Sequence, residues 1–228
     1  MPKTAADPNE DSYAHSDRLG TYAVSDGASI SYDSASWSRI LVRRFARRPD
    51  VTSQWLEEAT SEYLSLHDRD NLPWMKQAAL DRGSFASLLG LRFVALRDAI
   101  QIFAVGDTIA ALCDGNRILS TFPYSEPLQF DASPQLLSTK PAQNGFFTMP
   151  ESIGGRINEW SLAGLTSPIV LCATDALGRW LLDNREADPS PIATLCGIST
   201  LKEFRSFVHA ERTAGRMRRD DTTLLALW

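Results

Sequence analysis

Acidic residues stand at the ends of apolar runs along this sequence. Tyr22–Ser25 suits a buried strand and runs directly into Asp26 and Gly27, so a carboxylate is held at a strand end beside a backbone that is free to turn. Acids at similar boundaries follow along the chain: Asp107, Asp175 and Asp220. Carboxylate oxygens are hard ligands, and a set of them without paired His or Cys favours Mg²⁺ or Mn²⁺ over Zn²⁺.

An Asn-Glu-Asp sequence near the N-terminus adds two carboxylates, Glu10 and Asp11. Because successive side chains of a strand point to opposite faces, we expect one of these acids to ligate a metal ion and the other to lie behind it. Two divalent ions roughly 3.5–4 Å apart can share a bridging water, lower its pKa and hold a phosphoryl group for in-line displacement. This chemistry is phosphoester hydrolysis without a protein nucleophile.

Each of these signals also has a simpler structural interpretation. An Asp-Gly pair commonly ends a strand in a turn, and adjacent acids on a strand commonly form a solvated edge. The histidines, His15, His67 and His209, are scattered without metal-ligand spacing and are interpreted as surface or helix-face side chains. The ordered repetition of strand-end acids favours one shared site over a series of unrelated turns.

The elements that must position these acids alternate between helical and extended patterns. A helical pattern runs through Trp37 and Phe45 and ends at Pro49, and two further helices are predicted over Thr52–Leu66 and from Pro73 to Gly83. These helices are expected to form one layer. The chain then becomes extended, and four apolar runs predict an antiparallel meander over residues 84–96, 99–105, 108–113 and 117–121.

The second half of the chain begins irregularly. Residues 123–165 are rich in Pro, Ser, Gly and Asn, which fits either a long loop region or short strands around a flap. A buried strand at Ile169–Thr174 then delivers Asp175 to a following helix, and another helix is predicted over Thr200–Ala214 before a C-terminal strand. Strands and helices in this order indicate an α+β fold.

Length and composition restrict the function classes. We interpret the 228 residues as a single domain, with disorder predicted for residues 1–8. A net charge of -5 argues against nucleic acid and an anionic membrane as partners. No apolar run approaches the roughly 20 residues of a membrane helix, and no signal core is present, so a cytoplasmic protein is expected. The cysteines suit small buried thiols in a reducing compartment: Cys113, Cys172 and Cys196.

Six short motifs occur in a recognisable order: Asn9–Ser12, Val24–Gly27, Gly83–Ala86, Ala104–Thr108, Ala173–Leu177 and Asp220–Thr223. In order and approximate spacing the chain resembles the PP2C (PPM) family of metal-dependent Ser/Thr protein phosphatases, and within it a bacterial subgroup. The resemblance spans essentially the whole chain. It implies a PP2C-like sandwich of two antiparallel β-sheets flanked by α-helical layers, with the metal ions at one end of the sandwich.

The resemblance also implies roles for the acids. Asp26 would bridge two ions, with the carbonyl oxygen of Gly27 beside it. Asp175 and Asp220 would complete one metal site, and Glu10 the other. The implied metal ligands are Glu10, Asp11, Asp26, Gly27, Asp107, Asp175 and Asp220, of which Asp26, Asp175 and Asp220 are also assigned as catalytic. The cofactors would be two Mn²⁺ or Mg²⁺ ions, with a weaker third ion near Asp107.

The departures from the family pattern concern substrate binding. The usual phosphate-binding arginine has no counterpart near Ala5–Ala6, where Lys3 is the nearby cation, so substrate-binding residues remain unassigned. Ala28 stands where some members carry a proton-donating histidine, which would leave protonation of the leaving group to a metal-bound water. The strand that precedes the Asn-Glu-Asp motif in the family is also missing, so the first sheet is expected to be one strand short.

The primary hypothesis is a phosphoprotein phosphatase acting on phosphoserine and phosphothreonine, which opposes a partner Ser/Thr kinase. In the bacterial subgroup the partners can also include von Willebrand A domain proteins. The alternative is a catalytically weak or inactive PP2C-like regulatory or binding module, which the absent arginine and short N-terminus motivate. A third interpretation is that the acids only form strand-end turns in an unrelated α+β protein. It requires that all six motifs occur in this order by coincidence.

Overall fold

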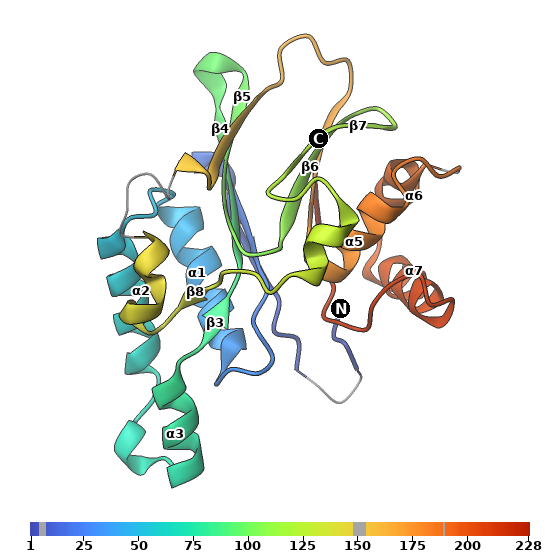
Figure 1. The fold of residues 1–228 in the computed structure, drawn as a ribbon. Coiled ribbons are helices and arrows are strands. Elements are labelled where there is room, and N and C mark those ends of the chain that lie inside the picture. The colour runs from blue at the N-terminus through green and yellow to red at the C-terminus, as the bar shows by residue number, and fades with distance from the viewer. Residues whose placement is uncertain (5–7, 148–153, 189) are drawn as a thin grey trace.

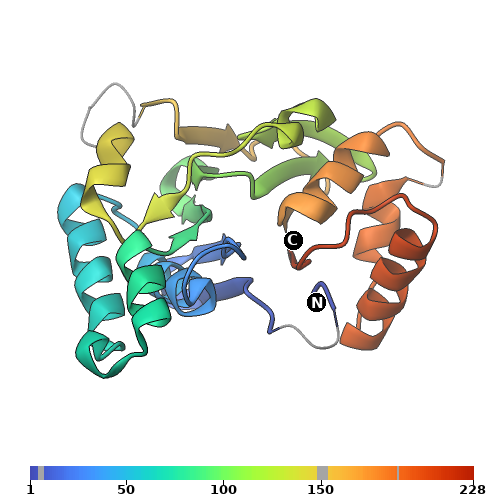
Figure 2. The ribbon, with the colours of Figure 1, turned by 60° about the horizontal axis from the view of Figure 1, so that its bottom comes forward.

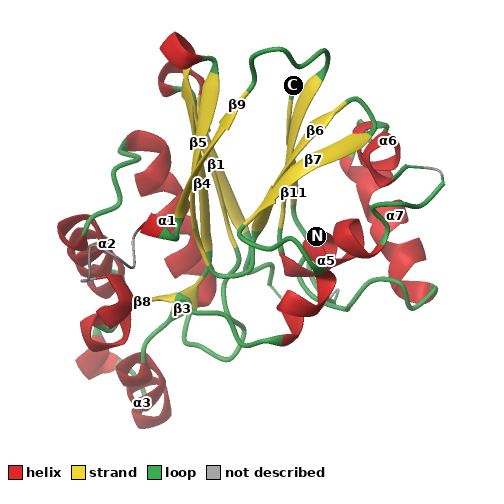
Figure 3. Cartoon of the chain, turned by 45° about the horizontal axis from the view of Figure 1, so that its top comes forward, coloured by secondary structure: helices red, strands yellow, loops and turns green. Residues whose placement is uncertain are grey.

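Two antiparallel β-sheets stack face to face, and helices cover the outer face of each (Figures 1 and 3). The computed structural model describes residues 1–4, 8–147, 154–188 and 190–228. A short additional pairing joins β3 (Phe85–Ala86) to β8 (Leu137–Ser138). This sandwich confirms the α+β fold predicted from the sequence.

The first sheet has the strand order β1-β2-β4-β5-β9, and the second has the order β11-β10-β6-β7. The strands of the first are β1 (Ser12–Ser16), β2 (Thr21–Ser25), β4 (Leu88–Val94), β5 (Ala99–Val105) and β9 (Ile157–Ser161). Those of the second are β6 (Ile109–Asp114), β7 (Arg117–Phe122), β10 (Pro168–Ala173) and β11 (Leu224–Leu227). All described neighbours pair antiparallel.

The predicted meander is divided between the two sheets. β4 pairs with β5, and β6 pairs with β7, but β5 and β6 belong to different sheets. The expectation of one continuous meander was therefore wrong at Gly106–Asp107, where the chain crosses from one sheet to the other. Because this crossing lies at an end of the sandwich, it leaves Asp107 at the edge where the sheets meet.

The central strands are apolar on both faces because each face is covered. Between the sheets, Leu89, Leu91 and Ile102 pack in one cluster with Leu112 and Val170. The outer faces pack against helices, so β2, β4, β5, β6 and β10 have nearly continuous buried runs. This double burial explains why the sequence showed long apolar runs in place of strict alternation.

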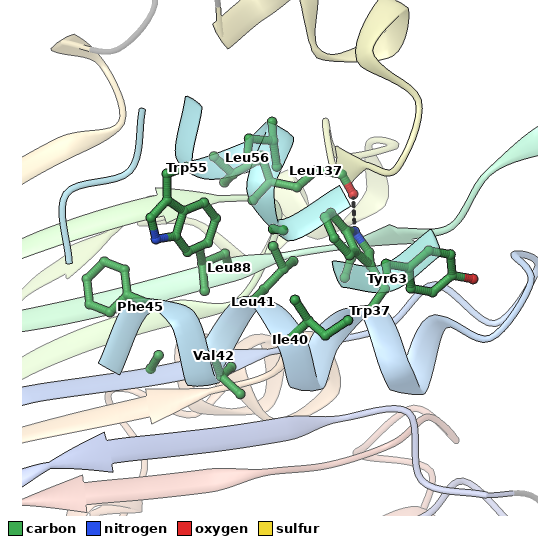
Figure 4. Close-up of a cluster of buried hydrophobic side chains, with 14 of the residues drawn as sticks. Trp37, Ile40, Leu41, Val42, Phe45, Trp55, Leu56, Tyr63, Leu88 and Leu137 are labelled. Atoms are coloured by element: carbon green, nitrogen blue, oxygen red, sulfur yellow. Dashed lines mark hydrogen bonds between the residues drawn. The ribbon is translucent and has the colours of Figure 1, made fainter. Parts of the chain in front are cut away.

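The helical layer over the first sheet consists of α1 (Ser34–Arg47), α2 (Ser53–Ser65) and α3 (Trp74–Arg82). The side chains of Asp33 and Thr52 cap α1 and α2 by accepting backbone N–H groups. Trp37 is fully buried beneath α2, and its indole N–H donates to the carbonyl oxygen of Leu137 at 2.8 Å (Figure 4). The predicted layer of three helices is confirmed.

The layer over the second sheet consists of α5 (Asp175–Asp183), α6 (Pro191–Cys196) and α7 (Leu201–Thr213). A reciprocal capping box between Thr200 and Glu203 starts α7. Burial raises the pKa of the Cys113 thiol to about 12, in keeping with a packing role. None of the helices in the described ranges has the length and apolar character needed to cross a bilayer.

The irregular region between β7 and β10 contains short elements. Helical turns cover Pro127–Asp131 and Pro141–Phe147, and β8 and β9 add short strands. Of the two possibilities left open by the sequence, the described residues fit short strands joined by irregular segments. Residues 148–153 lie outside the described part of the chain.

Residues 1–4, which lie within the segment predicted to be disordered, make hydrogen bonds to distant parts of the chain. Met1 and Thr222 exchange two backbone hydrogen bonds, of 2.5 and 2.8 Å, and the N–H of Lys3 donates to Asp221 Oδ1 at 2.6 Å. These partners are distant in sequence, so composition alone could not predict them. Residues 5–7 lie outside the described residues, and no strand precedes β1 in residues 1–4 and 8–11.

Candidate metal centre

Asp26 directly follows β2, where two hydrogen bonds fix its main chain. Its N–H donates to Ser87 Oγ at 2.9 Å, and its carbonyl oxygen accepts the N–H of Ser87 at 2.8 Å. Gly27 bridges to Ala86, and a Cβ at this glycine would lie 2.9 Å from the Cβ of Ser34. A larger residue therefore does not fit after Asp26, which explains the Asp-Gly pair.

Asp107 lies in the crossing between β5 and β6. Gly106 makes this turn at a φ of 98°, and a Cβ there would lie 2.5 Å from the Cβ of Ser87. Ser87 Oγ also shares a hydrogen bond of 2.6 Å with Thr108 Oγ1. Ser87 thus joins the segment that carries Asp26 to the segment that carries Asp107.

Asp175 is the first residue of α5 and follows β10 after Thr174. Its Oδ1 accepts the N–H of Ala176 at 2.5 Å, and a carboxylate in a first helical turn is favoured by the helix dipole. The hydroxyl of Thr174 donates to Asp11 Oδ2 at 3.1 Å and accepts the N–H of Thr223 at 3.0 Å. Thr174, which precedes α5, therefore connects the residue before β1 to the residue before β11 through hydrogen bonds.

The charges of these acids act on one another. The pKa of Asp26 is raised well above its ordinary value, first by burial and then by the charges of Asp11, Asp175, Asp107 and Asp220. Burial raises the pKa of Asp175 to about 7, and Asp107 and Asp220 add to that shift. The structure thus brings these five predicted site residues together at one end of the sandwich, with Asp26 subject to the charge of the other four.

Asp11 is the most deeply enclosed member of this set, with 8% of its surface exposed. Burial raises its pKa to about 7, the charge of Asp221 adds to the shift, and the hydroxyl groups of Thr223 and Thr174 oppose it. Its Oδ2 is bound by Thr174, but its buried Oδ1 has no hydrogen-bond partner among the described residues. An oxygen in this condition is an open acceptor for a cation or for water.

The carboxylate of Glu10 is engaged by other side chains, although its main chain lies beside Gly27. Its Oε2 accepts hydrogen bonds from Lys3 Nζ at 3.1 Å and from Ser29 Oγ at 2.5 Å, and its Oε1 accepts from Ser34 Oγ at 2.5 Å. Desolvation acts to lower the pKa of Lys3, but the hydrogen bond to Glu10 and the charge of Glu10 outweigh this effect, so the pKa is raised. Glu10 and Asp11 thus have different surroundings, as expected from the sequence, although both precede β1 and do not belong to a strand.

Asp221 has a structural role that the sequence did not indicate. It is 1% exposed, and its two carboxylate oxygens accept the backbone N–H groups of Lys3 and Glu10, at 2.6 and 2.5 Å. It therefore fixes the N-terminal residues beside the acid cluster. Ser87 and Thr174 were also missed as positioning residues, although Thr174 lies within one motif singled out in the sequence and Ser87 directly follows another.

Hard oxygen donors, mutual repulsion and one open buried oxygen all fit a divalent cation at this cluster. Among the residues that the structure describes, no three His, Cys, Asp or Glu side chains are arranged as a ready-made metal cage. Side-chain movement or water would therefore have to complete the coordination of a bound ion. A donor set made only of carboxylates favours Mg²⁺ or Mn²⁺ over Zn²⁺, whose usual ligands are cysteine and histidine.

Comparison with known proteins identifies the architecture. No protein-family model and no curated protein matches the sequence. Among solved structures, a bacterial serine phosphatase has a TM-score of 0.59 at 12% identity, over 96% of this chain and 91% of its own. The Ser/Thr phosphatase Stp1 of Staphylococcus aureus has a TM-score of 0.55 at 12% identity, over 97% and 90%. A photosystem II phosphatase has a TM-score of 0.52 at 16% identity, over 85% and 68%.

Proposed function

We propose that this chain, which has the fold of the PP2C-type phosphatases, is a metal-dependent phosphatase of phosphoserine and phosphothreonine in proteins. The observation that carries this proposal is the convergence of Asp11, Asp26, Asp107, Asp175 and Asp220 at one end of the sandwich. An acidic cluster of this kind is stable at neutral pH when divalent cations neutralise it. We further propose that residues 1–228 act as one domain.

Asp26, Asp175 and Asp220 would hold the principal ions, with Asp11 and Asp107 beside them and the Gly27 carbonyl oxygen next to Asp26. When bound, two Mg²⁺ or Mn²⁺ ions would supply an activated water and neutralise the charge of the phosphoryl group. Glu10 would join the ligand set only by exchanging its present partners, which are the ammonium group of Lys3 and two serine hydroxyls. We therefore assign Glu10 a weaker contribution than the resemblance implies.

The chain's own residues supply the positioning on which this reaction depends. Ser87 holds the main chain of Asp26, and Thr174 holds Asp11 relative to the start of α5. Lys3 places a partly exposed ammonium group beside Glu10 and Ser29, where it is the proposed cation for orienting an incoming phosphate. Two of the three Lys3 ammonium protons are engaged there, so one proton is left to donate to a phosphate.

The test is hydrolysis of a phosphothreonine peptide by the full chain with Mn²⁺, with Mg²⁺ and with a chelator. Turnover that the chelator removes, and that Asp26→Asn or Asp175→Asn lowers at least about a hundredfold, is the expected result. Asp188→Asn is the matched control, because this exposed acid lies outside the cluster. Equal turnover by the two site variants and the parent would exclude the proposed mechanism. A folded protein that shows no turnover would favour a regulatory module.

The biological setting follows from the reaction. A phosphoserine or phosphothreonine phosphatase requires a protein kinase that forms its substrate, so we propose that this chain opposes a Ser/Thr kinase. Phosphorylation of a candidate substrate by that kinase, followed by dephosphorylation by this chain, would test the pairing directly. A substrate that the parent protein cannot dephosphorylate under metal-saturated conditions would exclude that pairing.

A further inference from the structure

A cavity of about 550 Å³ lies between the first residues of the chain and α7. In Figures 1 and 2 the N-terminus lies beside this helix, and the carbonyl oxygen of Pro2 accepts a hydrogen bond from Arg212 Nη1 at 3.1 Å. The described lining residues are Met1, Pro2, Lys3, Thr4, Arg205, His209, Arg212, Thr213 and Arg219. Four of them are Lys or Arg, and none is acidic. We refer to this cavity as the basic pocket.

Three cationic or titratable side chains of the basic pocket lack protein partners. Arg205, His209 and Arg219 are exposed and make no hydrogen bond or ion pair with the residues that the structure describes. Several arginines elsewhere are paired with acids: Arg44 with Glu58 and Glu62, Arg69 with Asp81, and Arg179 and Arg218 with Asp131. Other exposed arginines, such as Arg43 and Arg47 of α1, also have no described partner, so what distinguishes the pocket is that its cations are gathered around one cavity. The whole chain has a net charge of -5, whereas the described lining of this pocket carries cations and no acid. The pocket is therefore a positively charged site on an acidic protein.

The basic pocket adjoins the candidate metal centre through the segment that contains Asp220. Arg212 donates to the carbonyl oxygen of Asp220 and to Thr222 Oγ1, and Arg219 is the residue before Asp220. Burial lowers the pKa of Arg212, and the charge of Arg219 acts in the same direction. Lys3 reaches Glu10 from the same lining. A peptide bound at the metal centre could therefore extend into this pocket.

We propose that the basic pocket binds an anionic group of the phosphoprotein substrate, close in sequence to the residue that is dephosphorylated. This inference rests on the proposed phosphatase function for the identity of the ligand. The group is a carboxylate of Asp or Glu or a second phosphate, because both offer the planar or clustered oxygens that guanidinium groups bind in pairs. Binding there would make acidic or multiply phosphorylated segments the preferred substrates.

The experiment measures peptide binding to the full chain by fluorescence anisotropy, so that it does not depend on turnover. The probes are a peptide with four glutamates, the same peptide with glutamines, and the glutamine peptide with one phosphoserine. The parent should bind both anionic probes about fivefold more tightly than the glutamine probe, and added salt should reduce this preference. A preference confined to the phosphoserine probe assigns the pocket to phosphate, and one confined to the glutamate probe assigns it to carboxylates.

The variant Arg205→Gln/Arg219→Gln should remove the preference, and each single substitution should reduce it. Both arginines lack described partners, so thermal unfolding should be unchanged. Arg43→Gln is the matched control, since Arg43 is an exposed arginine of α1 outside the pocket. A preference that survives the double substitution, or a parent protein without any preference, overturns the proposal.

A kinetic measurement separates this proposal from the proposed function. If the parent binds the anionic probes through Arg205 and Arg219 but hydrolyses no phosphothreonine peptide, the pocket stands and the phosphatase assignment fails. The parent protein could instead hydrolyse a neutral phosphothreonine peptide as fast as one with glutamates at every flanking position, and bind all probes equally. In that case the phosphatase assignment is supported and the pocket proposal fails.

Discussion

The N–H of Asp26 donates to Ser87 Oγ, and the N–H of Ser87 donates back to the carbonyl oxygen of Asp26. This reciprocal pair fixes the central acid of the cluster relative to β4. Ser87→Ala would leave the buried N–H of Asp26 without its acceptor, so we expect a loss of about 1–3 kcal/mol in the free energy of unfolding. Urea denaturation measures this loss. Ser206→Ala, on the exposed face of α7, should leave stability nearly unchanged, and an equal effect of both substitutions would contradict the assigned role.

Asp26→Asn should stabilise the metal-free protein at pH 8, while it abolishes activity. The carboxylate of Asp26 is buried among four other acids, and a neutral amide removes that repulsion. The melting temperature in chelator should rise by several degrees. Added Mn²⁺ should then raise the melting temperature of the parent but not of the variant, because binding to the native state alone stabilises it. A lower melting temperature for the variant in chelator would argue against repulsion within the cluster.

The stability of the metal-free protein should fall as pH rises from about 4 to about 7. Asp11 and Asp175 have pKa values raised to about 7 by burial, whereas the unfolded chain has ordinary values near 4. Within this window the folded state binds more protons than the unfolded state, so rising pH favours unfolding, and the contribution is lost above pH 7. Melting temperatures across this range in chelator measure the slope. Asp11→Asn should flatten it, and an unchanged slope would exclude Asp11 as its source.

Trp37 tests the helical layer over the first sheet. Trp37→Ala should cost about 3–5 kcal/mol in the free energy of unfolding, because it leaves a cavity in a fully buried cluster. Trp37→Phe should cost less, chiefly through the lost hydrogen bond to the Leu137 carbonyl oxygen. The control is Trp74→Phe, at a side chain that is 77% exposed, which should change stability by less than about 0.5 kcal/mol. Similar losses at both tryptophans would show that the packing described for α1 is incorrect.

Gly90 tests the contact between β4 and α1. A Cβ at Gly90 would lie 2.2 Å from Cζ of Phe45, so Gly90→Ala requires the buried ring to move. We expect a loss of about 1–3 kcal/mol in urea denaturation. Phe45→Leu should recover part of this loss when combined with Gly90→Ala. Gly145→Ala is the control, since a Cβ at Gly145 would meet nothing within 4 Å.

The helices could be predicted from the sequence because their determinants are local. The predicted helix Thr52–Leu66 is observed as Ser53–Ser65, with Thr52 as its cap. The assignment of strands to sheets could not be predicted in the same way. A Gly-Asp pair between two apolar runs fits a hairpin and a crossing between sheets equally well, and only packing of both sheets decides between them at Gly106–Asp107.

The candidate site was predictable at the level of residue type and position, but its internal contacts were not. Acids at strand ends could be identified from apolar patterns, and the structure brings five of them together. The contacts of Asp221 with Lys3 and Glu10 depend on residues at the opposite end of the sequence. No local pattern encodes such a contact, so neither the hydrogen bonds of Glu10 nor those of Met1 and Lys3 could be anticipated.

The acid cluster is assembled from segments that are far apart in the sequence. Asp11 and Asp26 adjoin strands of the first sheet, whereas Asp175 follows β10 and Asp220 precedes β11 of the second sheet. A hydrogen bond between Thr174 and Asp11 joins the two sides. Contacts between such distant parts of a chain close long loops and form slowly. An intermediate with only the first sheet folded would not bring Asp175 and Asp220 to Asp11 and Asp26, and a nascent chain that ends before Asp220 would lack that carboxylate. Metal affinity should therefore be acquired late, as the two sheets dock.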